Sequence, residues 1–243
     1  MKLALIGDGA MGRLVERLAL AEGHEVATVL AQRESSFRAE ELAEILGGHD
    51  AAVDFTVAEA VPLHAEACAL ARVPLVEGTT GWHASLEEVR GTIERADGAL
   101  IYGANFSVGV NLFYRIVARA AELFRGFDDY APFIEEAHHS RKRDAPSGTA
   151  LRLRDILAAS YDAEIPVAST RAGHIPGTHR VGFDSQADQI LLTHTARSRE
   201  GFAAGALVAA RWIQGRRGVY EFSEVIDEIL KGGGGSSTVR EGV

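Results

Sequence analysis

A glycine-rich hexapeptide directly behind the first apolar segment limits what the N-terminal part of this chain can fold into. Residues 2–6 predict a short strand, and residues 7–12 read Gly-Asp-Gly-Ala-Met-Gly. Residues 11–22 follow with apolar side chains at helical spacing. A GxGxxG sequence between a strand and a helix permits a tight turn and a close approach to a pyrophosphate. The sequence therefore predicts dinucleotide binding by Gly7, Asp8, Gly9, Ala10, Met11 and Gly12.

Strand and helix patterns alternate up to about residue 103, which is typical of a parallel sheet with helices on both faces. The predicted strands are 2–6, 25–30, 51–55, 74–77 and 98–102, and the predicted helices are 11–22, 39–46, 59–71 and 84–95. Ligands bind beyond the carboxyl ends of such strands, so the turns after the fourth and fifth strands are further candidates, although each alone is also ordinary turn chemistry. Their candidate cofactor contacts are Gly78, Thr79, Thr80, Gly103, Ala104, Asn105 and Phe106.

The residues after the second predicted strand bear on the choice between NAD and NADP. A carboxylate there would accept a hydrogen bond from the ribose 2′-OH of NAD, but this chain has Gln32 and then Arg33, which could pair with a 2′-phosphate. Glu34 and Asp8 place carboxylates nearby and leave the choice open. We expect NADPH or NADH as the cofactor, with the pattern favouring NADPH.

From residue 108 the pattern changes to α+β, which marks a second domain. Predicted helices cover 108–125 and 147–159, and predicted strands cover 130–137, 179–184 and 188–197. Two further helices are expected at 202–213 and 225–230, followed by a flexible Gly/Ser-rich tail. In this region His174 and His179 are expected to be structural or subunit-contact residues, and His194 a satisfied strand histidine.

Composition excludes several classes of function. The formal net charge is −9 with no long basic stripe, which argues against a nucleic-acid partner. The single cysteine, Cys68, excludes an internal disulfide and a Cys-rich metal site, and its Ala-rich helical surroundings predict a buried thiol. No signal peptide or membrane-spanning run is recognised, so we expect a cytoplasmic protein with no membrane association and no metal.

A histidine pair and a lysine stand close together in a loop after residue 136. Only three of the 25 basic residues are lysines, and Lys142 lies within four residues of His138 and His139. Lysine can give up a proton near neutrality in a suitable environment, whereas arginine cannot. A solvated basic loop is the alternative interpretation.

A helix entry follows the loop at residues 144–151, with Ser147 as the expected N-cap. Gly148 and Thr149 would lie in the first turn, where backbone N–H groups bind carboxylate or phosphate. The loop and the helix entry thus bring an anion-binding site, a lysine and two histidines within reach of one small acidic ligand.

Together these motifs resemble the dihydrodipicolinate reductase (4-hydroxy-tetrahydrodipicolinate reductase) family of the lysine pathway. The resemblance extends to about residue 222, and its most specific part is His-His, Lys and Asp-Ala-Pro-Ser-Gly-Thr at 138–149. It also rests on Glu136-Ala137 directly before the two histidines and on residues 7–12, 53–56, 78–81 and 104–111.

The resemblance implies an α/β fold: a Rossmann-like parallel-sheet dinucleotide-binding domain and an α+β substrate and oligomerisation domain with a mixed sheet. We expect the first from residues 1–104 with 204–231, the second from 105–203, and a flexible tail at 232–243. Family members reduce 4-hydroxy-tetrahydrodipicolinate, a small dicarboxylate, with NADPH or NADH, usually as homotetramers. His138 would then exchange protons, Lys142 would donate one, and the residues that would hold the substrate are His139, Ser147, Gly148 and Thr149.

Departures from the family pattern leave alternatives open. The first loop is shorter than in many members and lacks an arginine that would reach the cofactor phosphates. One alternative is a module that senses NAD(P)H without turnover. Another is a reductase of a different small acidic substrate, although Cys68 lies in the middle of a helical pattern and does not suit a thioester mechanism.

Overall fold

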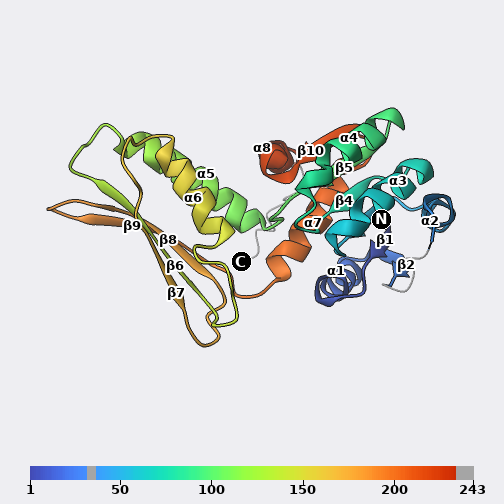
Figure 1. Ribbon diagram of the computed structural model, residues 1–243, viewed down its shortest axis with the longest axis horizontal. Coiled ribbons are helices and arrows are strands. Elements are labelled where there is room, and N and C mark those ends of the chain that lie inside the picture. The colour runs from blue at the N-terminus through green and yellow to red at the C-terminus, as the bar shows by residue number, and fades with distance from the viewer. Residues whose placement is uncertain (32–36, 234–243) are drawn as a thin grey trace, which may run out of the picture. The chain divides into compact units, whose positions relative to one another are not determined.

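The computed structural model describes residues 1–31 and 37–233, so Arg33 and most of the expected tail lie outside the described residues (Figure 1). The chain forms two compact units. Unit 1 comprises Met1–Val108 together with the chain from Glu200 onward, and unit 2 comprises Gly109–Arg199. No helix in the described ranges is long and apolar enough to cross a membrane.

Unit 1 contains a six-stranded parallel sheet in the order β10-β5-β4-β3-β1-β2. Its strands are β1 (Lys2–Ile6), β2 (Glu25–Leu30), β3 (Ala51–Asp54), β4 (Leu75–Glu77), β5 (Ala99–Tyr102) and β10 (Gly218–Glu221). Its helices are α1 (Ala10–Ala21), α2 (Ala39–Leu46), α3 (Val61–Ala71), α4 (Leu86–Arg95), α7 (Glu200–Ile213) and α8 (Phe222–Gly233), with short 3-10 turns η2 (Ala58–Ala60) and η3 (His83–Ser85).

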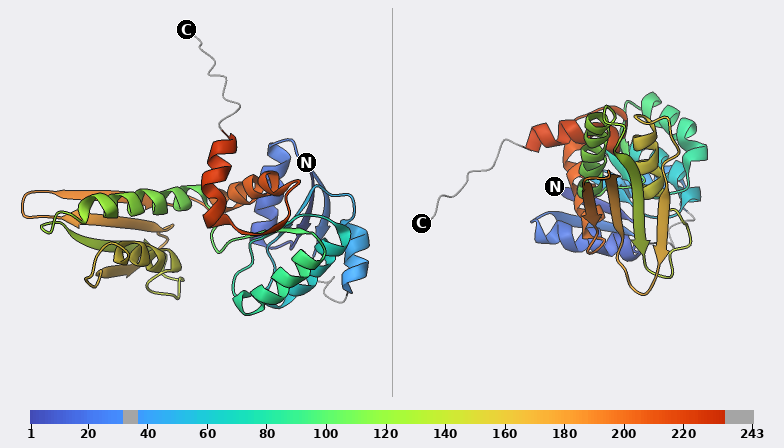
Figure 2. Two further views of the ribbon diagram at one scale, coloured as in Figure 1. Left: turned by 90° about the horizontal axis from the view of Figure 1, so that it is seen from above. Right: turned by 90° about the vertical axis from the view of Figure 1, so that its left-hand side faces the viewer.

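Helices cover both faces of this sheet because its strands are apolar on both sides. Successive residues of a strand point to opposite faces, and in β1 the side chains of Leu3 and Leu5 pack with α1, α7 and α8. Ala4 and Ile6 pack with α2, α3 and α4 on the other face. Figure 2 shows these two helix layers. The parallel α/β domain predicted from the alternating pattern is therefore confirmed.

From β1 the chain passes to β2, which pairs with one side of β1, and then to β3, which pairs with the other side. The carboxyl ends of β1 and β3 therefore form a topological switch point. The first glycine loop lies at this edge. Gly7 has φ of +104°, and a Cβ on Gly12 would lie 1.9 Å from the Gly7 carbonyl oxygen. Glycine is required at both positions for α1 to begin this close to the strand end.

Unit 2 contains a four-stranded mixed sheet in the order β7-β6-β8-β9. The strands are β6 (Ala131–His138), β7 (Val167–Arg171), β8 (Thr178–Asp184) and β9 (Gln189–Thr195), with β6 and β7 parallel and the other pairs antiparallel. Helices α5 (Val108–Phe124) and α6 (Gly148–Ala158) pack on the sheet. The core between them contains Phe113, Val117, Ile134, Leu153, Val181 and Phe183.

Two short strands were not predicted. β7 reads Val-Ala-Ser-Thr-Arg, with its three central residues exposed, and β10 has four residues and begins at a glycine with φ of +105°. Both lie at sheet edges, where the buried apolar pattern that identifies a strand is weak. Cys68 is fully buried in α3, as predicted.

Candidate active site

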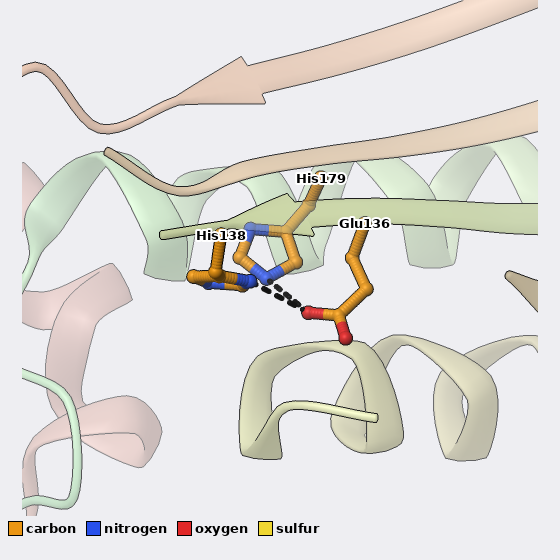
Figure 3. Close-up of side chains that lie close together, drawn as sticks. All are labelled: Glu136, His138 and His179. Carbon is orange, nitrogen blue, oxygen red and sulfur yellow. Dashed lines mark ion pairs between the residues drawn. The ribbon is translucent and has the colours of Figure 1, made fainter. Parts of the chain in front are cut away.

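Strand pairing in unit 2 gathers three titratable side chains. Glu136 and His138 are two residues apart on β6 and so point to the same face of the sheet. His179 on β8 lies directly opposite Glu136 in the antiparallel register. All three side chains are buried, and Figure 3 shows the two imidazoles beside the carboxylate.

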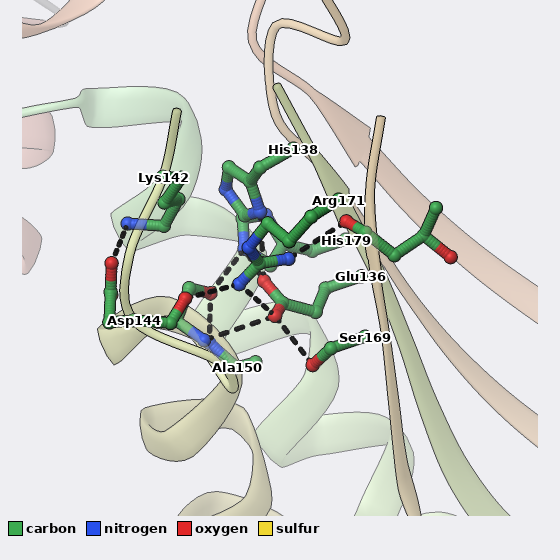
Figure 4. A network of polar contacts seen from close by, with 10 residues as sticks. Glu136, His138, Lys142, Asp144, Ala150, Ser169, Arg171 and His179 are labelled. Atoms are coloured by element: carbon green, nitrogen blue, oxygen red, sulfur yellow. Dashed lines mark hydrogen bonds and ion pairs between the residues drawn. The ribbon is translucent and has the colours of Figure 1, made fainter. Parts of the chain in front are cut away.

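The carboxylate of Glu136 is held by three hydrogen bonds to one oxygen. Oε1 accepts from the Ser147 backbone N–H at 3.1 Å, from Ser169 Oγ at 2.7 Å and from Arg171 Nη2 at 2.7 Å (Figure 4). Burial alone would raise the pKa of Glu136, but the hydrogen bonds from Ser147, Ser169 and Arg171 outweigh it and lower the pKa to about 2. Glu136 is therefore an anion near neutral pH.

The other oxygen of Glu136 faces the histidines. Oε2 lies 2.9 Å from His138 Nδ1 and 3.9 Å from His179 Nε2. Burial lowers the pKa of His138, and the Glu136 carboxylate acts in the opposite direction. Burial and the neighbouring His138 lower the pKa of His179 to about 4. His179 is therefore neutral near pH 7. For His138 burial outweighs the Glu136 carboxylate, so the net shift of its pKa is also downward.

Lys142 and Asp144 form an ion pair in the loop that follows β6. Lys142 Nζ lies 2.9 Å from Asp144 Oδ1, and the Lys142 backbone N–H donates to the His139 carbonyl. Arg171 donates to the Asp144 carbonyl, which ties the loop to β7 (Figure 4). His139 is half-buried at the end of β6. The loop therefore lies against the same group of residues as Glu136.

The start of α6 completes this group. Ser147 caps the helix, as predicted, since its Oγ accepts from the Ala150 N–H at 3.2 Å. The same Oγ lies 3.1 Å from His179 Nε2. Lys142 and then the Gly148 backbone N–H lower the pKa of Asp144, so the helix start already interacts with a carboxylate of the protein. Ser147 is buried, while Gly148 is exposed and Thr149 half-buried.

The donor atoms of Glu136, His138 and His179 lie within 4.8 Å of one another, a spacing that a metal ion could use. However, Arg171 lies 2.7 Å from Oε1 of Glu136, and the N-terminus of α6 adds positive charge beside this carboxylate. A further cation would be repelled by both. We therefore interpret this cluster as a group that holds protons.

In unit 1 the first glycine loop lines a pocket of about 230 Å³. Gly9 caps α1 without any side-chain hydrogen bond, and a Cβ placed on Gly9 would meet no atom within 4 Å. An uncapped helix start with open space before it is suited to a phosphate group. The residues that line the pocket are Ile6, Gly7, Asp8, Gly9, Leu30, Ala31, Leu42, Phe55, Thr56, Val57, Ala60 and His64.

The loop after β4 is tied to its neighbours by Thr79. Its N–H donates to Glu77 Oε1 at 2.7 Å, its Oγ1 accepts from the Thr56 N–H at 3.0 Å, and its carbonyl accepts from Trp82 Nε1. Gly78 packs so closely on Phe55 that a Cβ would lie 2.1 Å from the ring. The contacts of Thr79 thus join the loops that follow β3 and β4, while Thr80 is exposed.

In the loop after β5, mainly backbone atoms could contact a cofactor. Phe106 is buried, and its ring centroid lies 4.8 Å from that of Phe222. Asn105 Oδ1 accepts from the Ser107 N–H at 2.9 Å, Ala104 is exposed, and Gly103 packs against Phe222. The Phe106 side chain belongs to the core, so only the backbone of this residue could reach a cofactor.

A pair of buried carboxyl groups lies beneath these loops. Asp54 and Glu77 are opposite each other on β3 and β4, and both are fully buried. Asp54 Oδ2 lies 2.6 Å from His64 Nδ1. Burial and then the Asp54 carboxylate raise the pKa of Glu77 well above its ordinary value. The neutral form of Glu77 is therefore favoured beside the Asp54 carboxylate.

Several site residues were missed by sequence reasoning. Glu136 entered only as part of a motif, although its spacing of two from His138 on a strand was a usable signal. Ser169 and Arg171 lie on the unpredicted β7. His179 was expected to be a structural or subunit-contact residue, and the structure places it in the Glu136 cluster. His174 is exposed, and the His194 ring lies beside Phe113.

Comparison with known proteins gives consistent matches over both units. A family model described as dihydrodipicolinate reductase, N-terminus, matches residues 1–106, and one described as dihydrodipicolinate reductase, C-terminus, matches residues 109–226. A 4-hydroxy-tetrahydrodipicolinate reductase of Christiangramia forsetii is 35% identical over 243 residues, with 95% of this chain and 100% of the relative covered. One of Archaeoglobus fulgidus is 37% identical, with 88% and 94% covered.

Among solved structures, the fold is similar to that of a dihydrodipicolinate reductase from Paenisporosarcina with dipicolinate bound. The TM-score is 0.76, the sequences are 21% identical, and the similarity covers 93% of this chain and 99% of that chain. At this identity the likeness concerns the fold: a parallel-sheet unit followed by a mixed-sheet unit.

Proposed function

The chain belongs to the dihydrodipicolinate reductase family and is an oxidoreductase of lysine biosynthesis; from its site we propose how it reduces 4-hydroxy-tetrahydrodipicolinate to tetrahydrodipicolinate. The family resemblance read from the sequence is thereby confirmed. The observation that carries the assignment of the chemistry is the buried Glu136–His138 pair beside Lys142 and the start of α6.

The substrate is a dianion, so it needs anion recognition and a source of protons. The N-terminus of α6, with Gly148 and Thr149 in its first turn, and Lys142 would bind one carboxylate. Asp144 interacts with both features in this structure, and a substrate carboxylate would take over its contacts. His139, half-buried at the entrance to the loop, would contact the same ligand, while Ser147 holds the helix start in place.

Protonation would come from His138 and Lys142. A proton delivered near the ring nitrogen makes the adjacent carbon a better hydride acceptor, and such general acid catalysis contributes about 10²–10⁴-fold. His138 is the residue that we expect to exchange protons during turnover, because its ring lies beside a permanent anion. Lys142 would be the second donor.

Unit 1 would hold the cofactor, which supplies a hydride when bound. The uncapped start of α1 with Gly7, Asp8, Gly9, Ala10, Met11 and Gly12 would face the pyrophosphate. Gly78, Thr79 and Thr80 after β4 and Gly103, Ala104, Asn105 and Phe106 after β5 would shape the rest of the site. We propose NADPH or NADH, with Arg33 deciding the preference.

We also propose that the protein is a homotetramer that assembles through unit 2. β9 is an edge strand of the mixed sheet, and its Ile190 and Leu191 are 40% and 49% exposed. Apolar side chains on an exposed edge strand favour contact with another copy. Light scattering coupled to size-exclusion chromatography should give four times the 26.0 kDa chain mass.

The test of the proposed function is steady-state oxidation of NADPH and of NADH with enzymatically generated substrate. We expect turnover with both cofactors and loss of turnover in Lys142→Ala with cofactor binding retained. Binding of NAD(P)H without turnover would favour a sensing module instead. Turnover with a different acidic substrate alone would assign the site to another reductase.

A further inference from the structure

We propose that Glu136 is the positioning residue of the active site: its Oε2 atom holds the proton of His138 on Nδ1, so that Nε2 alone exchanges protons with the substrate. This inference rests on the proposed function, because it gives Glu136 a part in the same reaction. In each turnover Nε2 would take up a proton from solvent and pass it to the substrate, and His138 would return to a neutral ring with Nδ1 protonated.

The orientation of the carboxylate is fixed by its other oxygen. Oε1 accepts from three donors on three different residues: the Ser147 N–H at the start of α6, and Ser169 and Arg171 on β7. Rotation of the carboxylate would break all three bonds. Oε2 is therefore left pointing at the His138 ring, as Figures 3 and 4 show.

The two facing atoms depend on each other. Oε2 of Glu136 and Nδ1 of His138 form an ion-pair contact at 2.9 Å, and among the described residues neither atom makes a hydrogen bond. A buried carboxylate oxygen beside an imidazole nitrogen is satisfied when that nitrogen carries the proton. The pair therefore favours the Nδ1–H form of His138.

Gly177 lies beside the edge of the His138 ring that carries Nε2. Gly177 has φ of +127°, and a Cβ built on it would lie 3.3 Å from Cδ2 and 3.4 Å from Nε2 of His138. Any side chain at this position would press against the Nε2 edge, which is where the proton is exchanged. The absence of a side chain at Gly177 thus leaves room beside Nε2, while Nδ1 faces Glu136.

His179 does not compete for this role. Its Nε2 atom lies 3.9 Å from Glu136 Oε2 but 3.1 Å from Ser147 Oγ, and its ring meets that of His138 edge to face at 5.0 Å. The His179 ring therefore packs against the His138 ring. The other charged groups that act on His138 are Lys142, Arg171 and Asp144.

Glu136→Gln would reverse the arrangement without removing its contacts. The three donors at Oε1 require an oxygen there, so the amide NH2 of glutamine must occupy the position of Oε2. An NH2 group facing Nδ1 cannot accept a proton from it, so His138 must accept at Nδ1 and carry its proton on Nε2. The helix start and Arg171 keep their acceptor, and only the tautomer changes.

The experiment compares Glu136→Gln with Glu135→Gln and wild type by steady-state kinetics and by 15N NMR of the histidine ring. Glu135 is the matched control because it is the next residue on β6, points to the other side and pairs with Arg180 at 3.5 Å on the surface. We expect kcat of Glu136→Gln to fall by about 100-fold, the lower end of the contribution of a positioned general acid. The substrate KM should stay within about threefold, and Glu135→Gln should resemble wild type.

The NMR spectra test the proposal even if Glu136→Gln does not fold, because the wild-type spectrum alone reports the tautomer of His138. Wild type should show His138 with its proton on Nδ1, and Glu136→Gln should show it on Nε2. A wild-type spectrum with the proton on Nε2 overturns the proposal, whether or not the variant folds. Unchanged kcat in a folded Glu136→Gln also overturns it, and so does an unchanged tautomer.

Two further outcomes distinguish a positioning role of Glu136 from metal binding and from a protein without reductase activity. Loss of wild-type activity after treatment with EDTA, restored by Zn²⁺, would assign Glu136, His138 and His179 to a metal and overturn the proposal. A wild-type protein without reductase activity would refute the proposed function, whereas the tautomer measurement would still report whether Glu136 sets the proton position on His138.

Discussion

Glu77 offers a direct test of the buried carboxyl pair in unit 1. Its Oε1 atom accepts the Thr79 N–H at 2.7 Å, and Oε2 lies among buried groups next to Asp54. Glu77→Leu keeps the size of the side chain but removes both functions. The Thr79 N–H and an Asp54 oxygen would each lose a partner, at about 1–3 kcal/mol per group. We expect a loss of roughly 2–6 kcal/mol, a large part of the 5–15 kcal/mol that stabilises an ordinary protein.

Glu77→Gln should behave differently. Glutamine keeps an acceptor for Thr79 and offers an N–H toward Asp54, so stability near neutral pH should stay within about 1 kcal/mol of wild type. The pKa of Glu77 is raised in the folded protein by burial and by Asp54. A group with a raised folded pKa contributes stability that is fully present below its unfolded pKa and is lost as pH rises through the folded value. Wild type should therefore lose stability as pH rises from the ordinary pKa of a glutamic acid, about 4.3, toward the raised value, and Glu77→Gln should lose less.

The assay is urea unfolding followed by circular dichroism at a series of pH values from about 4 upward, with Glu87→Gln as control. Glu87 lies on α4 with a side chain that is 87% exposed, and its substitution should have little effect. Parallel pH profiles for wild type and Glu77→Gln would refute the raised pKa of Glu77. A Glu77→Leu variant as stable as wild type would refute the hydrogen-bonding argument.

Four further predictions concern binding and turnover. Lys142→Arg should lose most of its kcat because arginine cannot give up its proton, and a rate near wild type would reduce Lys142 to an anion clamp. Arg33→Ala should raise the KM for NADPH by roughly 10- to 150-fold and leave the KM for NADH nearly unchanged. An equal rise in both KM values would refute the pairing of Arg33 with the 2′-phosphate. His139→Gln should raise the substrate KM more than it changes kcat, as measured by initial rates. Gly12→Ala should abolish cofactor binding in a fluorescence titration, since its Cβ would lie 1.9 Å from the Gly7 carbonyl oxygen.

The fold of unit 1 could be predicted closely because its central strands β1, β3, β4 and β5 are almost wholly buried and alternate with helices. Each of these elements carries its own signal in the sequence, and β1, β2 and α2 were predicted with the bounds observed. β7 and β10 carry no such signal. They are short edge strands whose place depends on β6 and β5, far away in the sequence.

The site was predictable only in part for a related reason. His138 and Lys142 were identifiable by residue type and spacing, and Ser147 by its capping position. The partners of Glu136 come from β7 and β8, and which residue faces Glu136 depends on the register of strands that sequence reasoning did not pair. The Asp54–Glu77 pair has the same origin, since it follows from the register of β3 and β4.

The construction of unit 1 from two stretches of chain has a consequence for synthesis on the ribosome. Leu3 and Leu5 of β1 pack against α7, whose Ala206 and Leu207 are fully buried. When residues 1–108 have emerged, α1 is the one helix that covers this face among those described, and α7 and α8 are missing while the whole of unit 2 is being translated. Unit 2 is continuous and can fold as it leaves the tunnel. The first half of unit 1 must therefore wait in a partly folded, chaperone-accessible form until α7 arrives to close its core.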